Sequence, residues 1–209
     1  MSLSHTLLPA LLGLSTGLAL IVAIGAQNAY VLKLGIQGHN RTILPVVLLC
    51  ALSDAVLIFA GVLGVGIVVE QVPAALVVVR VIGAGFLIVY GLFAAFRAVR
   101  PSVLVPEGGN APVSTRTAVA TIAALTWLNP HVYLDTLLFL GSVANQHGPV
   151  ERWWWAGGAI LGSFVWFFGL GFGARLLRPF FARPSSWRIL DALIAVVMIA
   201  LGLRLALGA

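Results

Sequence analysis

The chain has 209 residues, of which 61% are hydrophobic and only 9% are charged, and its mean hydropathy is +1.09. A soluble domain carries about 25% charged residues, so this composition excludes a water-soluble surface and predicts an integral membrane protein. The net charge of +6 does not indicate nucleic-acid binding, because the basic residues lie at the ends of hydrophobic runs, where the positive-inside rule expects them.

Six hydrophobic segments are long enough to cross a bilayer, which takes about 20 helical residues. They cover residues 7–32, 43–69, 74–96, 117–143, 153–174 and 187–208. The first segment lacks the positive n-region of a secretory signal, so we expect it to be retained as a span. The sixth has a short charge-free centre, since Asp191 and Arg204 lie within it. We therefore predict an all-α integral membrane protein with six transmembrane helices.

Polar residues and helix breakers interrupt the first and the fourth of these segments. The first contains Gly25, Gln27 and Asn28, and the fourth contains Asn129 and Pro130. Such residues are costly in lipid, because the backbone groups that they free find no water there. Matching breaks in two halves of a chain are typical of secondary transporters, in which broken helices meet at the substrate site. We predict that helices 1 and 4 are broken at Gly25 and Pro130.

Two carboxylates lie deep inside the predicted spans. Asp54 is the only charged residue of the second segment, and Asp135 is the only one of the fourth. An acid in the membrane must face a partner or a wet cavity, and it is a functional candidate by default. Two alternatives stay open: a packing pair between Asp54 and a serine or an amide, and a capping role for Asp135 on freed backbone amides.

The polar residues of the breaks and the two acids form one candidate site. The candidate substrate-binding residues are Gln27, Asn28, Asp54, Asn129, Tyr133 and Asp135, and Asp54 and Asp135 are also the candidates for proton coupling. Catalytic chemistry is not expected, because Cys50 is the only cysteine and the four histidines lack metal-ligand spacing. We expect no metal, no cofactor and no enzymatic activity.

The chain divides into two halves around a loop rich in proline and glycine. We expect a single transmembrane transporter domain with a first repeat at about residues 1–100, a linker at 101–116 and a second repeat at about 117–209. The two halves show weak sequence similarity, since residues 52–56 correspond to 161–165 and Gly91 corresponds to Gly202. Because each repeat has an odd number of spans, the two three-helix repeats would be inverted relative to each other.

The distribution of arginine and lysine favours one orientation. These residues flank the first, third and fifth connections between spans: Lys33, Arg41, Arg97, Arg100, Arg116, Arg175, Arg178, Arg183 and Arg188. The positive-inside rule predicts that these connections are cytoplasmic. With six spans, both termini would then lie outside.

The motifs at residues 25–28, 52–58 and 126–135 closely resemble those of the LysE/ArgO family of bacterial L-lysine and L-arginine exporters. The resemblance covers essentially the whole chain, although Ala26 stands where the family usually has proline. It implies export of basic amino acids from the cytoplasm, in exchange for protons, by a multi-pass protein of the bacterial plasma (inner) membrane. The partners it implies are basic amino acids, protons and the lipid bilayer, and a homodimer stays open.

Rival functions are weighed against the same residues. A divalent-cation exporter of related architecture would use two buried acids, but such sites usually gather more oxygen ligands. Export of another amino acid also stays open. A membrane-embedded enzyme lacks a visible nucleophile or redox pair, and a purely structural subunit is disfavoured by the two polar breaks.

Overall fold

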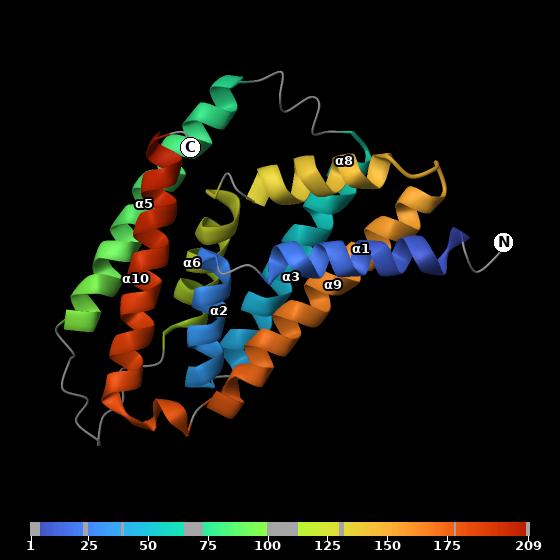
Figure 1. The fold of residues 1–209 in the computed structure, drawn as a ribbon. Helices are drawn as coiled ribbons and strands as arrows, with labels where there is room; N and C mark the ends of the chain where they lie inside the picture. Colours follow the sequence, from blue (N-terminus) through green and yellow to red (C-terminus); the bar gives the residue numbers. More distant parts are fainter. Residues whose placement is uncertain are drawn as a thin grey trace.

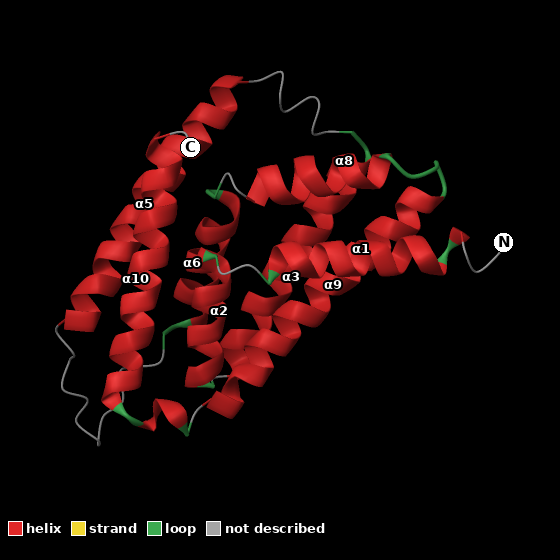
Figure 2. Ribbon diagram, viewed as in Figure 1, coloured by secondary structure: helices red, strands yellow, loops and turns green. Residues whose placement is uncertain are grey.

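The computed structural model describes residues 5–22, 25–38, 40–64, 73–99, 113–129, 132–177 and 179–207. Every regular element within these ranges is helical (Figure 2). The α-helices are α1 (Leu7–Ile21), α2 (Ala26–Gln37), α3 (Asn40–Val62), α5 (Pro73–Val99), α6 (Thr115–Trp127), α8 (Leu140–Asn145), α9 (Glu151–Gly173) and α10 (Pro184–Leu207). A π-helix, η2 (Tyr133–Phe139), and two 3-10 helices, η3 (Ala174–Leu177) and η4 (Phe180–Ala182), complete the described part. The predicted all-helical fold is confirmed there.

Several helices have the length and composition of membrane spans. Three stretches qualify alone, Asn40–Val62, Glu151–Leu177 and Ser185–Arg204, and α1 and α2 qualify together as a bent pair. The described residues also include the shorter apolar helical stretch Ala84–Val99 within α5. The fourth expected span is divided among α6, η2 and α8. These helices identify a membrane protein, and the full count of six spans remains a prediction.

The first hydrophobic segment is two helices that meet at 83°. Gly25 precedes α2 with φ −120° and ψ 174°, an extended conformation that no helix can include. In the fourth segment, α6 ends at Trp127 and the chain resumes as the π-helix η2. Pi-helical turns are rare and occur frequently at functional sites. Pro130, the expected breaker of this segment, lies outside the described residues.

Glycines allow α1 to lie directly against α9. A Cβ atom on Gly13 would lie 1.9 Å from the carbonyl oxygen of Trp155, and one on Gly158 would lie 1.9 Å from that of Ala10. Gly17 and Gly162 belong to the same contact, since their Cβ positions meet Ala159 and Leu14. Small residues four apart permit such backbone approach between helices in a membrane. The two Gly-x-x-x-Gly pairs thus join helices of one chain.

Helices α5 and α10 form a second close pair and lie side by side in Figure 1. Their contact is reciprocal: a Cβ atom on Gly91 would lie 2.6 Å from Ile199, and one on Gly202 would lie 2.7 Å from Ile88. Each glycine therefore faces an isoleucine that lies three residues from the other glycine. The glycines that correspond between the two halves of the sequence occupy equivalent places in the contact.

An ion cluster connects α2 with this pair. Lys33 of α2 donates to Asp191 of α10 at 2.5 Å, and Arg97 of α5 donates to the same carboxylate oxygen at 3.3 Å. Lys33 and Asp191 are largely buried. Losing one partner of a buried ion pair is costly, because the remaining charge is left in a poor solvent. Asp191 therefore holds three helices together, which explains a charge in an otherwise apolar segment.

Most of the described basic residues gather at one end of the molecule. The C-terminal ends of α2, α5 and α9 and the N-terminal ends of α3 and α10 all lie in the lower part of Figure 1, and the C-terminal end of α10 lies at the opposite end. We call the lower end the basic end, because it carries Lys33, Arg41, Arg97, Arg175 and Arg188. Helix α1 runs across the molecule, away from the axis of α2.

The contact between α1 and α9 yields a matched test of packing. We expect Gly158→Ala to lower the stability of the purified protein by about 1–3 kcal/mol, because the added methyl group meets the backbone of α1. The neighbouring Gly157 has no atom within 4 Å of its Cβ position. Gly157→Ala should therefore raise helix stability by about 0.5–1 kcal/mol. Thermal unfolding in detergent measures both, and equal midpoints for the two variants would contradict the contact.

Candidate functional site

A cavity of about 280 Å³ lies between the two interrupted segments. This volume is just below the usual range of ligand pockets, about 300–1,000 Å³, and suits a small solute. The cavity draws on both segments and on α3, α9 and α10. Its lining consists of Leu20, Ile21, Gly25, Ala26, Gln27, Asn28, Asp54, Asn129, Val132, Asp135, Thr136, Leu140, Phe167, Leu201 and Arg204.

Five of the six candidate substrate-binding residues meet at this cavity. Gln27 and Asn28 come from the start of α2, Asp54 from α3, Asn129 from the end of α6 and Asp135 from η2. The sixth candidate, Tyr133, is not in the lining. Its hydroxyl donates to the carbonyl oxygen of Trp127 at 2.8 Å, and its ring contacts the Trp127 ring. Tyr133 thus joins η2 to the end of α6 and does not reach the cavity.

Asp54 is the buried acid of the site, with 4% of its surface exposed. It accepts a hydrogen bond of 2.7 Å from the hydroxyl of Ser163 on α9. This is the serine pairing that the sequence left open as an alternative. It does not exclude ligand binding, because a carboxylate has about four acceptor positions and Asp54 also lines the cavity. Asp54 can therefore hold α9 and still present charge to a solute.

Asp135 has a different environment. It lies in the π-helix η2, near its start, and its side chain is exposed where that of Asp54 is buried. Both acids line the same cavity. The two carboxylates thus differ in burial at one cavity.

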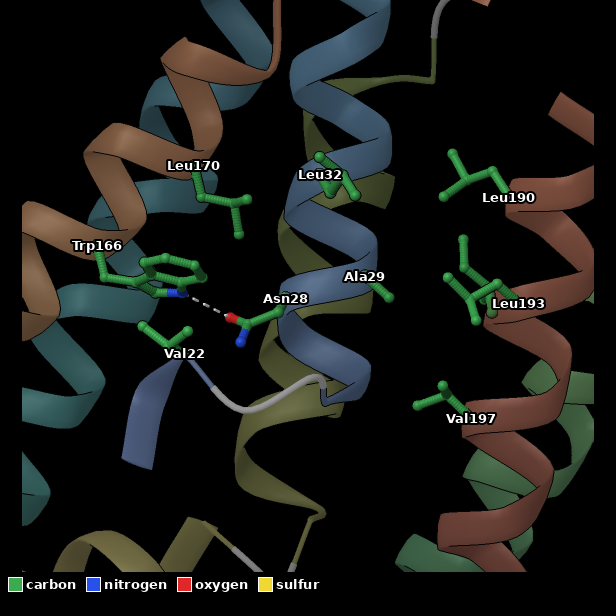
Figure 3. Close-up of a pocket in the computed structure, with 10 residues that line it drawn as sticks. Val22, Asn28, Ala29, Leu32, Trp166, Leu170, Leu190, Leu193 and Val197 are labelled. Carbon is green, nitrogen blue, oxygen red and sulfur yellow. Dashed lines mark hydrogen bonds between the residues drawn. The ribbon is translucent and has the colours of Figure 1, made fainter. Parts of the chain in front are cut away.

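The amides of the first break serve both structure and the cavity. The Asn28 amide nitrogen donates to the carbonyl oxygen of Ile21 at 2.6 Å, and its oxygen accepts from the Trp166 indole at 3.1 Å (Figure 3). Asn28 therefore satisfies a carbonyl at the end of α1 and connects it with α9. The Gln27 amide nitrogen is buried and has no hydrogen-bond partner within the described part of the chain. Buried donors are rarely left so, and the Gln27 side chain also lies beside that of Cys50.

A second cavity of about 330 Å³ lies on the other side of Asn28. Figure 3 shows Leu170 from α9 and Leu190, Leu193 and Val197 from α10 around it. Asn28 lines both cavities, and this second lining contains no charged residue. A charged solute would lose hydration there without compensation. The cavity with the two acids is therefore the candidate site.

Arg204 is the residue of the lining that sequence reasoning passed over. It belongs to the last turns of α10 and lines the cavity together with Asp54 and Asp135. The sequence signal was present, since a charge inside an apolar segment is a functional candidate. In the sequence, Arg204 only shortens the charge-free centre of the sixth segment. With Arg204 included, the three ionisable side chains of the cavity sum to one negative charge.

The described residues do not gather a group of three or more His, Cys, Asp or Glu side chains that could hold a metal ion. Apolar helices of membrane-spanning length surround a small polar cavity. The cavity lies between the junction of α1 with α2 and that of α6 with η2. This combination is typical of a membrane transporter for a small solute.

Residues 18–209 match the LysE type translocator family, and the chain therefore belongs to this family. The resemblance carried by its motifs is thus confirmed. LysE type translocators are transport proteins and not enzymes, so the chain is a multi-pass membrane transporter.

The relatives include exporters from several bacteria. The arginine exporter ArgO of Salmonella newport is 42% identical over 197 residues, which cover 93% of this chain and 91% of that protein. The lysine exporter LysE of Corynebacterium diphtheriae is 36% identical over 225 residues, covering 94% and 97%. A candidate amino-acid transporter of Mycobacterium tuberculosis is 47% identical over 182 residues, covering 87% and 89%. No solved structure matches the chain.

Proposed function

We propose that the protein exports basic amino acids, L-lysine or L-arginine, from the cytoplasm across the bacterial inner membrane. The observation that carries this proposal is the cavity lined by Asp54 and Asp135 among three amides. A basic amino acid has two cationic groups, and two carboxylates can each bind one of them. The names of the relatives, a lysine exporter and an arginine exporter, agree with this chemistry.

We propose further that export is coupled to proton entry. Moving one positive charge outward against an inside-negative potential costs about 2.3 kcal/mol per 100 mV, so passive release cannot concentrate lysine outside. A proton that enters as the amino acid leaves cancels this charge movement. Asp54 is our candidate for the shared carrier, because it is a buried carboxylate that lines the cavity. Asp135, which is more accessible, is the second candidate.

Alternating access would rest on two inverted three-helix repeats joined by the linker at 101–116. Two contacts support this arrangement. Asp54 and Ser163 occupy corresponding positions of the halves and bond to each other, and Gly91 and Gly202 make equivalent contacts between α5 and α10. Contacts between equivalent positions are expected near a pseudo-two-fold axis. Rocking of one repeat against the other would expose the cavity to each side in turn.

A divalent-cation exporter is supported less well. The cavity contains only two carboxylates, whereas Ca²⁺ takes about 6–8 oxygen ligands. Arg204 also adds a positive charge to the lining, which repels a metal ion. Neither feature disfavours binding of a basic amino acid. Two carboxylates suffice for its two cationic groups, and its own carboxylate is attracted by Arg204.

Exchange in proteoliposomes tests the proposed function directly. Vesicles loaded with lysine should take up radiolabelled lysine and arginine by counterflow, and should not take up glutamate. When the medium outside the vesicles is more acidic than their lumen, protons that enter should accelerate the release of lysine from the lumen. Stimulated flux of a divalent metal without exchange of basic amino acids would replace the proposal by the metal exporter.

Asp54→Asn separates the charge of this residue from its shape. The amide oxygen still accepts the Ser163 bond, but the side chain is neutral at every pH. In the wild type, lysine binding should weaken as the pH falls, because protonation removes a carboxylate. In the variant, binding should be about 10-fold weaker or more, as expected for a lost charge-assisted bond, and proton-driven export should stop. Titration calorimetry at several pH values measures this.

Asp135→Asn is the matched control for that experiment. It should lower lysine affinity and leave part of the pH dependence, since Asp54 remains. Export by Asp54→Asn with the pH profile of the wild type would transfer the coupling role to Asp135.

The gathering of basic residues at one end predicts that this end is cytoplasmic. Ser114, before α6, and Val150, before α9, are both exposed and belong to connections on opposite sides in this arrangement. In a background without Cys50, an impermeant thiol reagent should label Val150→Cys in intact cells. It should label Ser114→Cys only after permeabilisation, and labelling of Ser114→Cys in intact cells would reverse the orientation.

A further inference from the structure

Arg204 brings a fixed positive charge to a cavity whose other ionisable residues are acids. It lies on α10, whereas Asp54 lies on α3 and Asp135 on η2. The basic residues Lys33 and Arg97 do not line the cavity, and they already share the carboxylate of Asp191. Among the described residues that line the cavity, Arg204 is the one basic side chain. Arg204 ends the apolar stretch Ser185–Arg204 of this helix and is exposed.

The charge balance of the cavity indicates a role for Arg204. With both acids ionised, Asp54, Asp135 and Arg204 sum to one negative charge. A basic amino acid carries two positive groups and one carboxylate, so its net charge of about +1 at neutral pH balances the cavity. Each charged group of the solute then has an opposite partner in the lining. A diamine without a carboxylate would leave Arg204 facing like charges.

We propose that Arg204 binds the α-carboxylate of the exported amino acid, so that the cavity selects complete basic amino acids over diamines of the same length. This inference rests on the proposed function and names the recognition of one further group of the substrate. A guanidinium matches a carboxylate with two parallel hydrogen bonds, which gives geometric selectivity as well as charge. The acids on α3 and η2 then bind the amino group and the basic side chain.

A purely structural role for Arg204, as counter-ion of the nearby acids, has a different consequence. In that case removal of the guanidinium changes the cavity for every cationic ligand alike. Carboxylate recognition instead predicts opposite effects on ligands with and without a carboxylate. The selectivity between lysine and 1,5-diaminopentane, which is lysine without its carboxylate, distinguishes the two roles.

The experiment uses the purified full chain in lipid nanodiscs and measures binding of both ligands by calorimetry. For Arg204→Gln, we expect lysine affinity to fall by about 10- to 100-fold, the range for a lost hydrogen bond between charged groups. Affinity for the diamine should stay the same or rise, because a repelling charge is gone. Arg204→Lys should restore part of the lysine affinity. Arg188→Gln, the same change on the same helix at the basic end, should alter neither ligand.

The wild-type protein provides a second measurement that does not depend on the folding of a variant. It should bind lysine at least about 10-fold more tightly than lysinamide, in which the carboxylate is a neutral amide. Equal affinities for lysine and lysinamide, or an equal loss of lysine and diamine binding in Arg204→Gln, would overturn the role of Arg204. Failure of the wild type to bind any basic amino acid would instead overturn the proposed function.

Discussion

The constraint on which this structure depends is that backbone polar groups inside a membrane must be satisfied by the protein itself. The 83° bend between α1 and α2 removes the regular helical partners of the last carbonyls of α1. Asn28 replaces one of them by donating to Ile21, and Trp166 holds Asn28 in place from α9. The same amide borders the candidate cavity. The Asn28 side chain thus satisfies a carbonyl group at the bend and also lines the candidate site.

Glycine packing makes this arrangement possible at the level of the helices. Because Gly13 and Gly158 place the backbones of α1 and α9 in contact, α1 is held across the molecule and its end stays at the cavity. On α3, a Cβ atom on Gly61 would lie 2.3 Å from the carbonyl oxygen of Leu137 in η2 and 3.0 Å from Gly141 of α8. Close contacts of small residues therefore fix the chain on both sides of the cavity. Bulky residues at these points would separate the helices that supply the polar lining.

The sequence predicted the helical class, which the described residues confirm, and it singled out polar residues of which five line one cavity, because each leaves a local signal. Asp54 and the amides of the breaks are costly in an apolar segment, and this cost is visible without coordinates. Contacts across the chain are not visible in that way. Tyr133 follows a break as a ligand-binding residue would, but its hydroxyl bonds to Trp127. In the sequence, Arg204 only interrupts the last apolar segment. The fold brings α10 to the cavity that Asp54 and Asp135 line, and this long-range contact leaves no local signal.

The charge of the cavity also bears on how exchange would be coupled. With its three ionisable residues charged, the empty cavity of the proposed transporter carries one negative charge, and either a basic amino acid or a single proton neutralises it. The empty form and a form with both ligands are charged, and a charged cavity is costly to carry through an apolar environment. Conformational exchange is therefore easiest when one ligand, and only one, is bound. In the proposed transporter, this balance would favour an exchange of proton for amino acid without direct contact between the two.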